Sequence, residues 1–483
     1  WMILILGWVF VPFYTRSMVY TMPEFLERRY NPQSRTILSV ISLVSYVLTK
    51  VAVTVYAGGL VFQQVFGIKE LWGIDFFWIA AIGLVVLTAL YTIFGGMKSV
   101  LYTSVLQTPI LLLGSLIILV LGFKELGGWD EMMRVCGAVT VNDYGDTMTN
   151  LIRSNDDANF PWLGALIGSA IIGFWYWCTD QFIVQRVLSG KNEMEARRGT
   201  IFGAYLKLLP VFLFLIPGMI AFALHQKYIG AGGEGFLPML ANGTANADAA
   251  FPTLVAKLLP AGVKGLVVCG ILAALMSSLA SLFNSSAMLF TIDFYKRFKP
   301  ETPEKKLVGI GQIATIVIVV LGILWIPIMR SVGDVLYTYL QDVQSVLAPG
   351  IAAAFLLGIC WKRTSAQGGM WGLISGMVIG LTRLGAKVYY SNAGEVADST
   401  FKYLFYDMNW LFFCGWMFLF CIIVVIVVSL ATEAPTAEKI QGLVFGTATK
   451  EQKAATRASW NHWDIIHTVI ILAITAAFYW YFW

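Results

Sequence analysis

The chain has 483 residues, of which 58% are hydrophobic and only 13% are charged, whereas a soluble globular protein carries roughly 25% charged residues. This composition excludes a soluble globular protein. The net charge of +5 comes without a basic arm or an arginine-rich patch, and it therefore gives no reason to expect a nucleic-acid partner. Apolar runs of about 20 residues, long enough to cross a bilayer, recur along the whole length. We therefore predict an all-α polytopic membrane protein.

The expected helices follow one another along the whole chain, and we predict a single polytopic domain over residues 1–483. Residues 1–14 are apolar but too short to span a bilayer, and we interpret them as a partial helix of an N-terminally truncated sequence. Residues 124–161 and 226–261 are predicted to be outer loops, and residues 432–462 a cytoplasmic linker before the last helix. Eleven complete spans are predicted at 36–66, 75–94, 102–123, 162–185, 200–224, 262–294, 308–329, 333–361, 368–388, 409–431 and 463–482.

The distribution of Lys and Arg supports this order of helices. Cytoplasmic loops of membrane proteins are enriched in these residues, so the basic loops are predicted to face the cytoplasm and both chain ends to lie outside. No loop is long enough for a soluble catalytic domain, and the six cysteines and three histidines show neither disulfide nor metal-site spacing. Basic residues gather in alternate loops, within 15–35, 186–198, 296–306, 362–363 and 439–457.

A serine-rich stretch, residues 272–286, lies inside one of the predicted membrane helices. Five small residues share one face of this helix because they step by three and four: Ala274, Ser277, Ser278, Ser281 and Ser285. Hydroxyls at this spacing suit a small hard cation that takes oxygen ligands. Small residues are equally suited to packing between membrane helices, so the stretch alone leaves both interpretations open.

Charged residues also lie at depth in the predicted helices. Lys50 is in the middle of its span, Lys207 lies about two turns into its helix, and Asp180 follows the aromatic cluster at 175–177. Intramembrane charges are costly and usually line a cavity or pair with each other. Two simpler interpretations remain open, because Lys207 lies near enough to the inner end to extend to the interface, and the aromatic cluster suits ordinary packing.

Gln341 lies in a helix that we predict to be interrupted. It is followed by Asp342 and, in the same apolar segment, by the Pro349-Gly350 pair. Proline removes a helical hydrogen bond, and broken helices near the bilayer midplane are where transporters bind substrate. Gln341 is therefore a candidate substrate contact.

Several segments resemble one family, and the similarity runs essentially from end to end. The chain resembles the sodium–solute symporters, most closely their sodium–glucose cotransporter branch. The segments that carry the resemblance are TMPEFLERRY, SYVLTK, LYTIFGG, WYWCTDQFIVQR, YLKLLP, AALMSSLASLFNSS, FTIDFY and FLLGICWKR. The resemblance implies a LeuT-type inverted-repeat fold and sodium-coupled, alternating-access symport of a sugar across the cytoplasmic membrane, with Na⁺ as the coupling ion.

The resemblance also implies roles for individual residues. Ala274 would offer its carbonyl to sodium, and Ser277 and Ser278 their hydroxyls. Tyr176 matches an inner gate and Tyr337 an outer gate, and Asp180 and Arg186 would form a structural ion pair. The residues that match sugar contacts are Lys50, Tyr176, Trp177, Lys207 and Gln341. Donors, acceptors and an aromatic face suit a polyhydroxylated ring.

Four positions depart from the family pattern. Gly173 and Thr54 replace polar or acidic residues found in sugar carriers, which leaves the particular sugar unassigned. Ser104 replaces an Asp and Ala280 a Thr that mark a second sodium site in two-sodium relatives. We therefore expect one sodium per sugar.

Two alternative functions remain open. One is a symporter of a polyol or other small solute, and the other is a transport-like sensor domain. An enzyme is not expected, because no deep histidine, carboxylate pair or nucleophile–base arrangement is evident. The expected partners are a small-molecule sugar and the lipid bilayer, without an obligatory protein partner.

Overall fold

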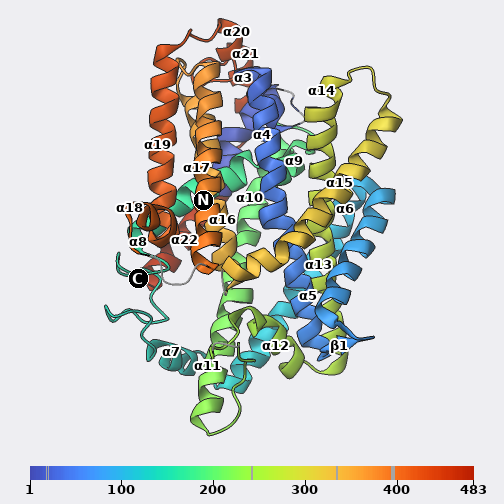
Figure 1. The fold of residues 1–483 in the computed structure, drawn as a ribbon, viewed down its shortest axis with the longest axis vertical. Helices are drawn as coiled ribbons and strands as arrows, with labels where there is room; N and C mark the ends of the chain where they lie inside the picture. Colours follow the sequence, from blue (N-terminus) through green and yellow to red (C-terminus); the bar gives the residue numbers. More distant parts are fainter. Residues whose placement is uncertain (18, 20, 241–242, 333–334, 393–396, 483) are drawn as a thin grey trace.

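The computed structural model describes residues 1–483 except 18, 20, 241–242, 333–334, 393–396 and 483. Helices make up most of the chain, and many run along the long axis of the molecule (Figure 1). Within the described residues, nine helices are long and apolar enough to cross a membrane. They are Pro32–Phe66, Gln107–Leu126, Trp162–Thr179, Glu193–Gly230, Ala261–Phe298, Glu304–Met329, Leu336–Cys360, Trp410–Ala431 and His462–Tyr481. The predicted all-α membrane architecture is confirmed.

The first part of the chain forms the N-terminal helices and one short hairpin. The helices are α1 (Met2–Ile5), α2 (Val11–Ser17), α3 (Met22–Arg29), α4 (Pro32–Ser45), α5 (Ala52–Phe66), α6 (Phe76–Leu126) and α7 (Trp129–Gly137). Two π-helical segments, η1 (Leu6–Phe10) and η2 (Tyr46–Val51), continue helices, and β1 (Glu70–Leu71) pairs antiparallel with β2 (Ile74–Asp75). Asn31 caps the run from α4 to α5 by accepting the Ser34 amide at 2.8 Å. The run ends at Gly67, whose φ of 67° suits glycine.

The middle of the chain carries the segments that hold most of the candidate site. The helices are α8 (Trp162–Phe174), α9 (Gln181–Leu188), α10 (Glu193–Pro210), α11 (Ile216–Gly230), α12 (Ala250–Leu258), α13 (Ala261–Met288) and α14 (Lys296–Phe298). Three π-helical segments, η3 (Trp175–Thr179), η4 (Val211–Leu215) and η6 (Leu289–Tyr295), join them, and η5 (Ala247–Ala249) is a 3₁₀ turn.

The last part of the chain adds five long helices or helical runs and several short ones. These elements are α15 (Glu304–Val332), α16 (Leu336–Cys360), α17 (Ala366–Asn392), α18 (Thr400–Lys402), η7 (Tyr403–Asp407), α19 (Trp410–Ala431), α20 (Ala437–Ile440), α21 (Lys450–Ala458) and α22 (His462–Tyr481). Helix α17 packs closely on α16, because a Cβ on Gly376 would come within 2.6 Å of the Gly350 Cα atom. Glycine at this contact allows the two backbones to approach.

Helix α6 differs from the prediction of two spans at 75–94 and 102–123. The structure has one helix of 51 residues across both apolar stretches. The glycines and the lysine at 95–98 indicated a loop, but glycine only disfavours a helix, by about 1 kcal/mol per residue. Among the described residues of α6, Gln107–Leu126 has the length and hydropathy of a span, and Phe76–Leu90 is a shorter apolar helix.

The predicted interruption of the helix around Gln341 is wrong. Helix α16 is continuous from Leu336 to Cys360 and contains Pro349. The break lies instead in the predicted span 162–185, at Asp180. Its φ of −81° and ψ of 125° are extended and separate η3 from α9.

The segments expected on the two sides of the membrane lie at opposite ends of the molecule. Figure 1 shows α3, α14, α20 and α21 at the top, and α7, α12 and β1 towards the bottom. The first group comes from the basic loops and the linker at 432–462. The second comes from the two predicted outer loops and from the short connection between the predicted spans 36–66 and 75–94. This arrangement agrees with the predicted order of helices, while the sidedness itself stays a prediction.

Candidate functional site

The site is organised around two π-helical turns, η2 and η3. π-helical turns are rare and occur frequently at functional sites. The wider turns leave carbonyl groups in need of donors, and Tyr14 donates its hydroxyl to the Cys178 carbonyl at the end of η3. The two turns carry Lys50 and the aromatic pair Tyr176 and Trp177, respectively.

Asp180 forms the polar centre of this region. Its carboxylate is buried, with 4% exposure, and it caps α9 by accepting the Phe182 amide at 3.2 Å. The Tyr46 hydroxyl donates to the same carboxylate at 3.0 Å. A buried carboxylate needs such donors, because an unpaired buried charge is strongly unfavourable.

The remaining carboxylate oxygen of Asp180 forms a salt bridge with Lys50. The ammonium group also lies 4.7 Å from the Tyr46 ring centre, 5.3 Å from Tyr176 and 4.3 Å from Phe182. Aromatic faces attract cations at these distances. Lys50 is thus enclosed by one acid and three rings, and this environment differs from the direct sugar contact that the resemblance implies.

The expected ion pair between Asp180 and Arg186 stays a prediction, because the salt bridge described for Asp180 is the one with Lys50. Arg186 donates to the Ser281 hydroxyl of α13. Asp180, whose backbone is extended, pairs with Lys50 of η2.

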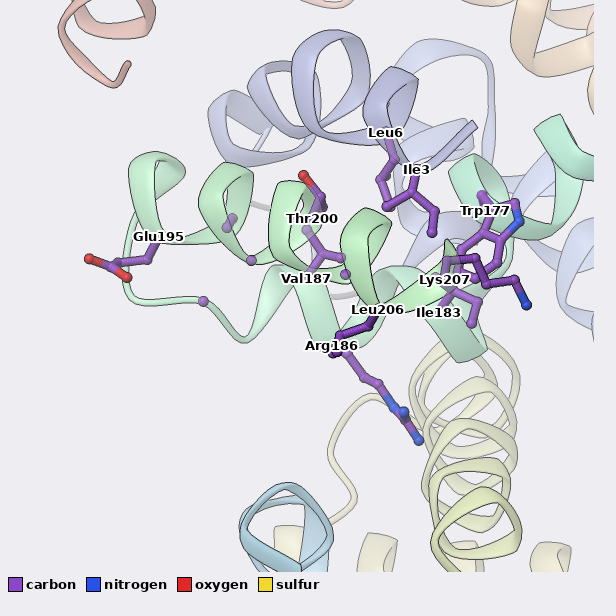
Figure 2. Close-up of a pocket in the computed structure, with 14 residues that line it drawn as sticks. Ile3, Leu6, Trp177, Ile183, Arg186, Val187, Glu195, Thr200, Leu206 and Lys207 are labelled. Atoms are coloured by element: carbon purple, nitrogen blue, oxygen red, sulfur yellow. The ribbon is translucent and has the colours of Figure 1, made fainter. Parts of the chain in front are cut away.

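Trp177 and Lys207 lie together at a cavity of about 480 Å³. The Lys207 ammonium is 5.4 Å from the Trp177 ring centre. Figure 2 shows these two side chains beside each other, with Glu195 at the far side of the set. Glycines 199 and 203 of α10 also line the cavity, and a Cβ added to either would meet nothing within 4 Å. The wall of α10 is therefore open to a ligand.

The other predicted contacts lie outside this lining set. Tyr176 packs edge-on against Trp177, with ring centres 5.1 Å apart. Gln341 lies on α16, one turn after Tyr337, and is half-buried, whereas Tyr337 is 56% exposed. Among the described residues, the structure thus brings Trp177 and Lys207 together but does not add Gln341 to the same cavity wall.

The predicted sodium residues lie on α13. Ser277 is buried, and its hydroxyl is 2.6 Å from the hydroxyl of Ser104 on α6. Ala274 and Ser278 are half-buried on the same helix. Three neutral oxygen-bearing positions at this spacing suit a hard cation, but a helix-packing role fits them equally.

Sequence reasoning missed the residues that connect α9 to this serine face. Gln185 donates its side-chain amide to the Ser285 hydroxyl at 2.6 Å and to the Ser281 carbonyl at 3.2 Å. Gln181 accepts the Met22 amide at 2.8 Å. The signal was present in the sequence, because two glutamines four positions apart share one face of a helix.

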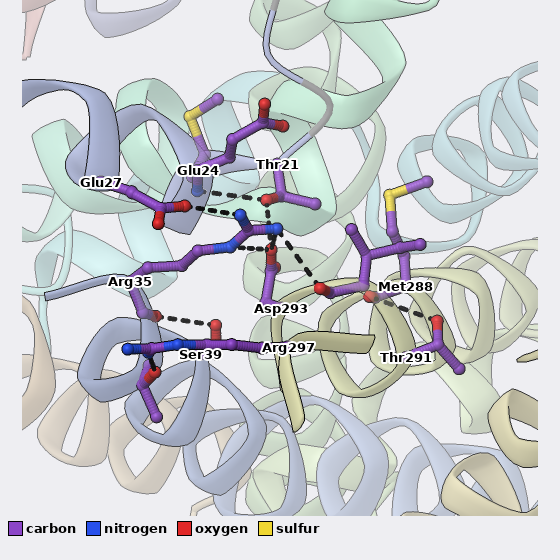
Figure 3. A network of polar contacts seen from close by, with 12 residues as sticks. Thr21, Glu24, Glu27, Arg35, Ser39, Met288, Thr291, Asp293 and Arg297 are labelled. Atoms are coloured by element: carbon purple, nitrogen blue, oxygen red, sulfur yellow. Dashed lines mark hydrogen bonds and ion pairs between the residues drawn. The ribbon is translucent and has the colours of Figure 1, made fainter. Parts of the chain in front are cut away.

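A second missed cluster ties α3 and α4 to η6 at the end of α13. Asp293 is fully buried and accepts hydrogen bonds from Thr21 at 2.9 Å and from Arg35 Nε at 2.7 Å. Arg35 also pairs with Glu27 at 2.6 Å. Figure 3 shows the Arg35 guanidinium between the two carboxylates.

A third missed cluster lies beside Gln341. The carboxylate of Asp342 is 2.5 Å from the Lys387 ammonium and 3.8 Å from Arg383. Both cations come from α17, four positions apart. The start of α16 is held separately by Asp248, which accepts the Leu336 amide at 3.1 Å. Burial raises the pKa of the Asp248 carboxyl.

The fold and these clusters define a class of protein, a helical secondary transporter that binds small ligands between membrane helices. The sequence profile of the sodium:solute symporter family matches residues 1–376. The chain therefore belongs to the sodium:solute symporter family. It is a multi-pass membrane transporter, not an enzyme, and Na⁺ is its coupling ion.

Three curated relatives are similar over most of the chain. The sodium/mannose cotransporter of Bos taurus is 35% identical, over 100% of this chain and 83% of the relative. The sodium/myo-inositol cotransporter 2 of Homo sapiens is 35% identical, over 92% and 67%. The sodium/glucose cotransporter 1 of Ovis aries is 37% identical, over 89% and 67%.

One solved structure has a similar fold. It is a Na⁺-coupled sialic acid symporter in a substrate-bound, outward-open state, with a TM-score of 0.67 and 21% identity over 90% of this chain and 83% of that chain. At this identity the likeness shows the fold alone. It confirms the predicted LeuT-type class without fixing the number of spans.

Proposed function

We propose that the protein couples sodium entry to the uptake of a monosaccharide-like sugar across the cytoplasmic membrane. The observation that carries this proposal is the cavity where Lys207 lies against the face of Trp177. An indole face suits the C–H side of a sugar ring, and an ammonium donates to its hydroxyls. The names of the mannose and glucose cotransporter relatives support the same substrate class.

The proposed sugar contacts are Tyr176, Trp177, Lys207 and Gln341, with Tyr176 and Tyr337 as the inner and outer gates. Lys50, which the resemblance also implies as a sugar contact, forms a salt bridge with Asp180 and lies 5.3 Å from the Tyr176 ring centre. Gln341 and Tyr337 would approach the sugar from α16. No obligatory protein partner is part of the proposal.

The proposed sodium ligands are the Ala274 carbonyl and the hydroxyls of Ser277 and Ser278. Ser277 is bonded to Ser104, so the hydroxyl is already oriented by a neighbouring helix. Pre-oriented oxygen ligands lower the ordering cost of binding.

Uptake into proteoliposomes tests this function. Purified protein is assayed with radiolabelled mannose, glucose and myo-inositol under inward sodium or potassium gradients. We expect faster uptake with sodium, and Ser277→Ala and Ser278→Ala each to raise the half-saturating sodium concentration roughly tenfold, as the loss of about 1.4 kcal/mol would. Ser286→Ala is the matched control, because its buried hydroxyl has no hydrogen-bond partner among the described residues. Equal uptake in potassium and sodium would overturn the proposal.

A second candidate keeps the fold and changes the solute to a polyol. The observation in its favour is the 35% identity to a protein named as a myo-inositol cotransporter. The same uptake panel separates the two, because a polyol carrier would take up myo-inositol in preference to the two hexoses. A sensor domain would show no uptake.

A further inference from the structure

Helix α9 lies between the aromatic turn η3 and the serine face of α13. It begins at the Asp180 break, where Lys50 and Tyr46 hold the carboxylate from η2. It continues for eight residues, Gln181–Leu188. Gln185 is five positions after Asp180, so its contact with α13 lies little more than one helical turn from the break.

The contact of α9 with α13 is made by polar side chains in a buried place. Gln185 is 8% exposed, and Ser281 and Ser285 are fully buried. One amide of Gln185 reaches both serines, through the Ser285 hydroxyl and the Ser281 carbonyl. Ser285 itself donates to the Ser281 carbonyl at 2.8 Å. Buried hydrogen bonds of this kind fix one register between two helices, because every alternative leaves a polar group unpaired.

The same two turns of α13 lead directly to the proposed sodium ligands. Ser281 is one turn beyond Ser277 and three positions beyond Ser278, so these side chains share a face. Arg186 donates to the Ser281 hydroxyl, and Figure 2 shows its guanidinium extending away from the cavity helices. Gln185 and Arg186 therefore contact two successive turns of the face that would bind sodium.

We propose that Gln185 and Arg186 are positioning residues that couple the sodium face of α13 to the solute gate at Tyr176. Sodium at Ser277 and Ser278 holds α13 in one register, the two α9 side chains transmit this register, and Asp180 passes it through Lys50 to the Tyr176 ring. The inference rests on the proposed function. Coupling between two sites requires an element whose position both ligands influence. Helix α9 contacts the serine face of α13 and directly follows η3, which carries Tyr176.

The experiment measures how strongly sodium changes the affinity for the solute. Uptake of radiolabelled mannose, glucose or myo-inositol, whichever the wild type takes up fastest, is recorded at saturating sodium and at one tenth of the half-saturating concentration. The ratio of the two half-saturating solute concentrations is the coupling ratio. In Gln185→Met, which keeps the side-chain volume and removes the amide, we expect this ratio to fall at least fivefold, within the usual range of allosteric coupling. Uptake at saturating sodium and solute stays within about twofold.

Two further variants make the test decisive. Ser285→Ala removes the hydroxyl that accepts from Gln185, and we expect it to lower the coupling ratio as well. If Gln185→Met does not reach the membrane, Ser285→Ala alone decides the question. The double variant should lose little beyond either single one, because both remove the same bond. Ser286→Ala, one position along the helix, retains the wild-type ratio.

The outcomes separate the inference from the function. A coupling ratio that stays at the wild-type value in both variants overturns the inference and leaves sodium-coupled uptake intact. Loss of maximal uptake without a change in the ratio also overturns it, because that is a purely structural effect. A wild type with no sodium dependence contradicts the proposed function, and the inference falls with it.

Discussion

The two lysines of the candidate site have opposite surroundings. Lys50 is enclosed by Asp180 and three aromatic rings, so its charge is already compensated. Lys207 faces a cavity and the Trp177 ring, and within the described part of the chain its ammonium has no carboxylate partner. A solute hydroxyl would therefore be a favourable hydrogen-bond acceptor for Lys207. At Lys50 it would compete poorly with the Asp180 carboxylate.

Replacing the proposed sugar donors should weaken sugar binding sharply. Leaving a buried polar group of the sugar unpaired costs about 1–3 kcal/mol. Lys207→Ala and Gln341→Ala are each expected to raise the half-saturating sugar concentration roughly tenfold or more. The measurement is sodium-driven uptake in proteoliposomes. The exposed residues Lys191 and Gln226 provide matched alanine controls, and an unchanged sugar dependence in both site variants would assign the two side chains a structural role.

The types of these site residues were predictable, but their partners were not. Membrane depth and residue type identified Lys50, Asp180 and Lys207, because isolated charges in apolar segments are costly. The choice of Lys50 as the partner of Asp180 depends on a backbone break at Asp180 and on the approach of η2 to η3. These are tertiary features that no local pattern in the sequence records.

At the scale of elements, helix breaks were harder to predict than helices. Proline at 349 predicted an interruption that α16 does not have. Its neighbour Gly350 packs against Gly376, and prolines are tolerated inside membrane helices that pack against neighbouring helices. The actual break at Asp180 follows a run of aromatic residues without glycine or proline. The capping bond from Phe182 to Asp180 explains it, and Asp is a favoured helix N-cap.

The Asp293 cluster should stabilise the contact between α4 and η6. Removing the arginine in Arg35→Gln leaves a fully buried carboxylate without its cation, which typically costs about 3–5 kcal/mol. We expect a lowered melting temperature of the detergent-solubilised protein. The pair of Arg28 and Glu24 offers the control, because the Arg28 side chain is 45% exposed and Arg28→Gln should change stability by less than about 1 kcal/mol.

The double variant Arg35→Gln with Asp293→Asn distinguishes a charge effect from a packing effect. Removing both charges eliminates the unpaired carboxylate, so part of the lost stability should return. A double variant that is as unstable as the sum of the two single variants would show that the ion pair itself contributes little.

At the scale of the whole molecule, the number of ions sets the gradient that the transporter sustains. One charge that crosses a membrane at about 100 mV contributes roughly 2.3 kcal/mol, and a tenfold sodium gradient adds roughly 1.4 kcal/mol. The sum of about 3.7 kcal/mol supports a sugar gradient of several hundredfold. Two sodium ions would square this ratio, so stoichiometry decides how far the solute is concentrated.

We predict one sodium per sugar. The two side chains that mark a second site in two-sodium relatives are replaced here by Ser104 and Ala280. In the structure the Ser104 hydroxyl is 2.6 Å from that of Ser277, and Ala280 is fully buried. Ser104 thus lies against a ligand of the proposed first site, and Ala280 offers no side-chain oxygen. A partly dehydrated cation held by one or two hydroxyls without a carboxylate lacks the oxygen ligands that it needs.

The reversal potential of the sugar-dependent current measures this number directly. Vesicles with known sodium and sugar gradients are clamped at a series of potentials, and the zero-current potential is compared with the values for one and two charges per sugar. We expect the value for one charge. The double variant Ser104→Asp with Ala280→Thr tests the physical reason. It restores a carboxylate beside Ser277 and the second side-chain oxygen, and it should move the reversal potential towards the value for two charges. A wild-type reversal potential that fits two charges would refute the single-sodium stoichiometry, since the second ion would then need a site that does not depend on Ser104 or Ala280.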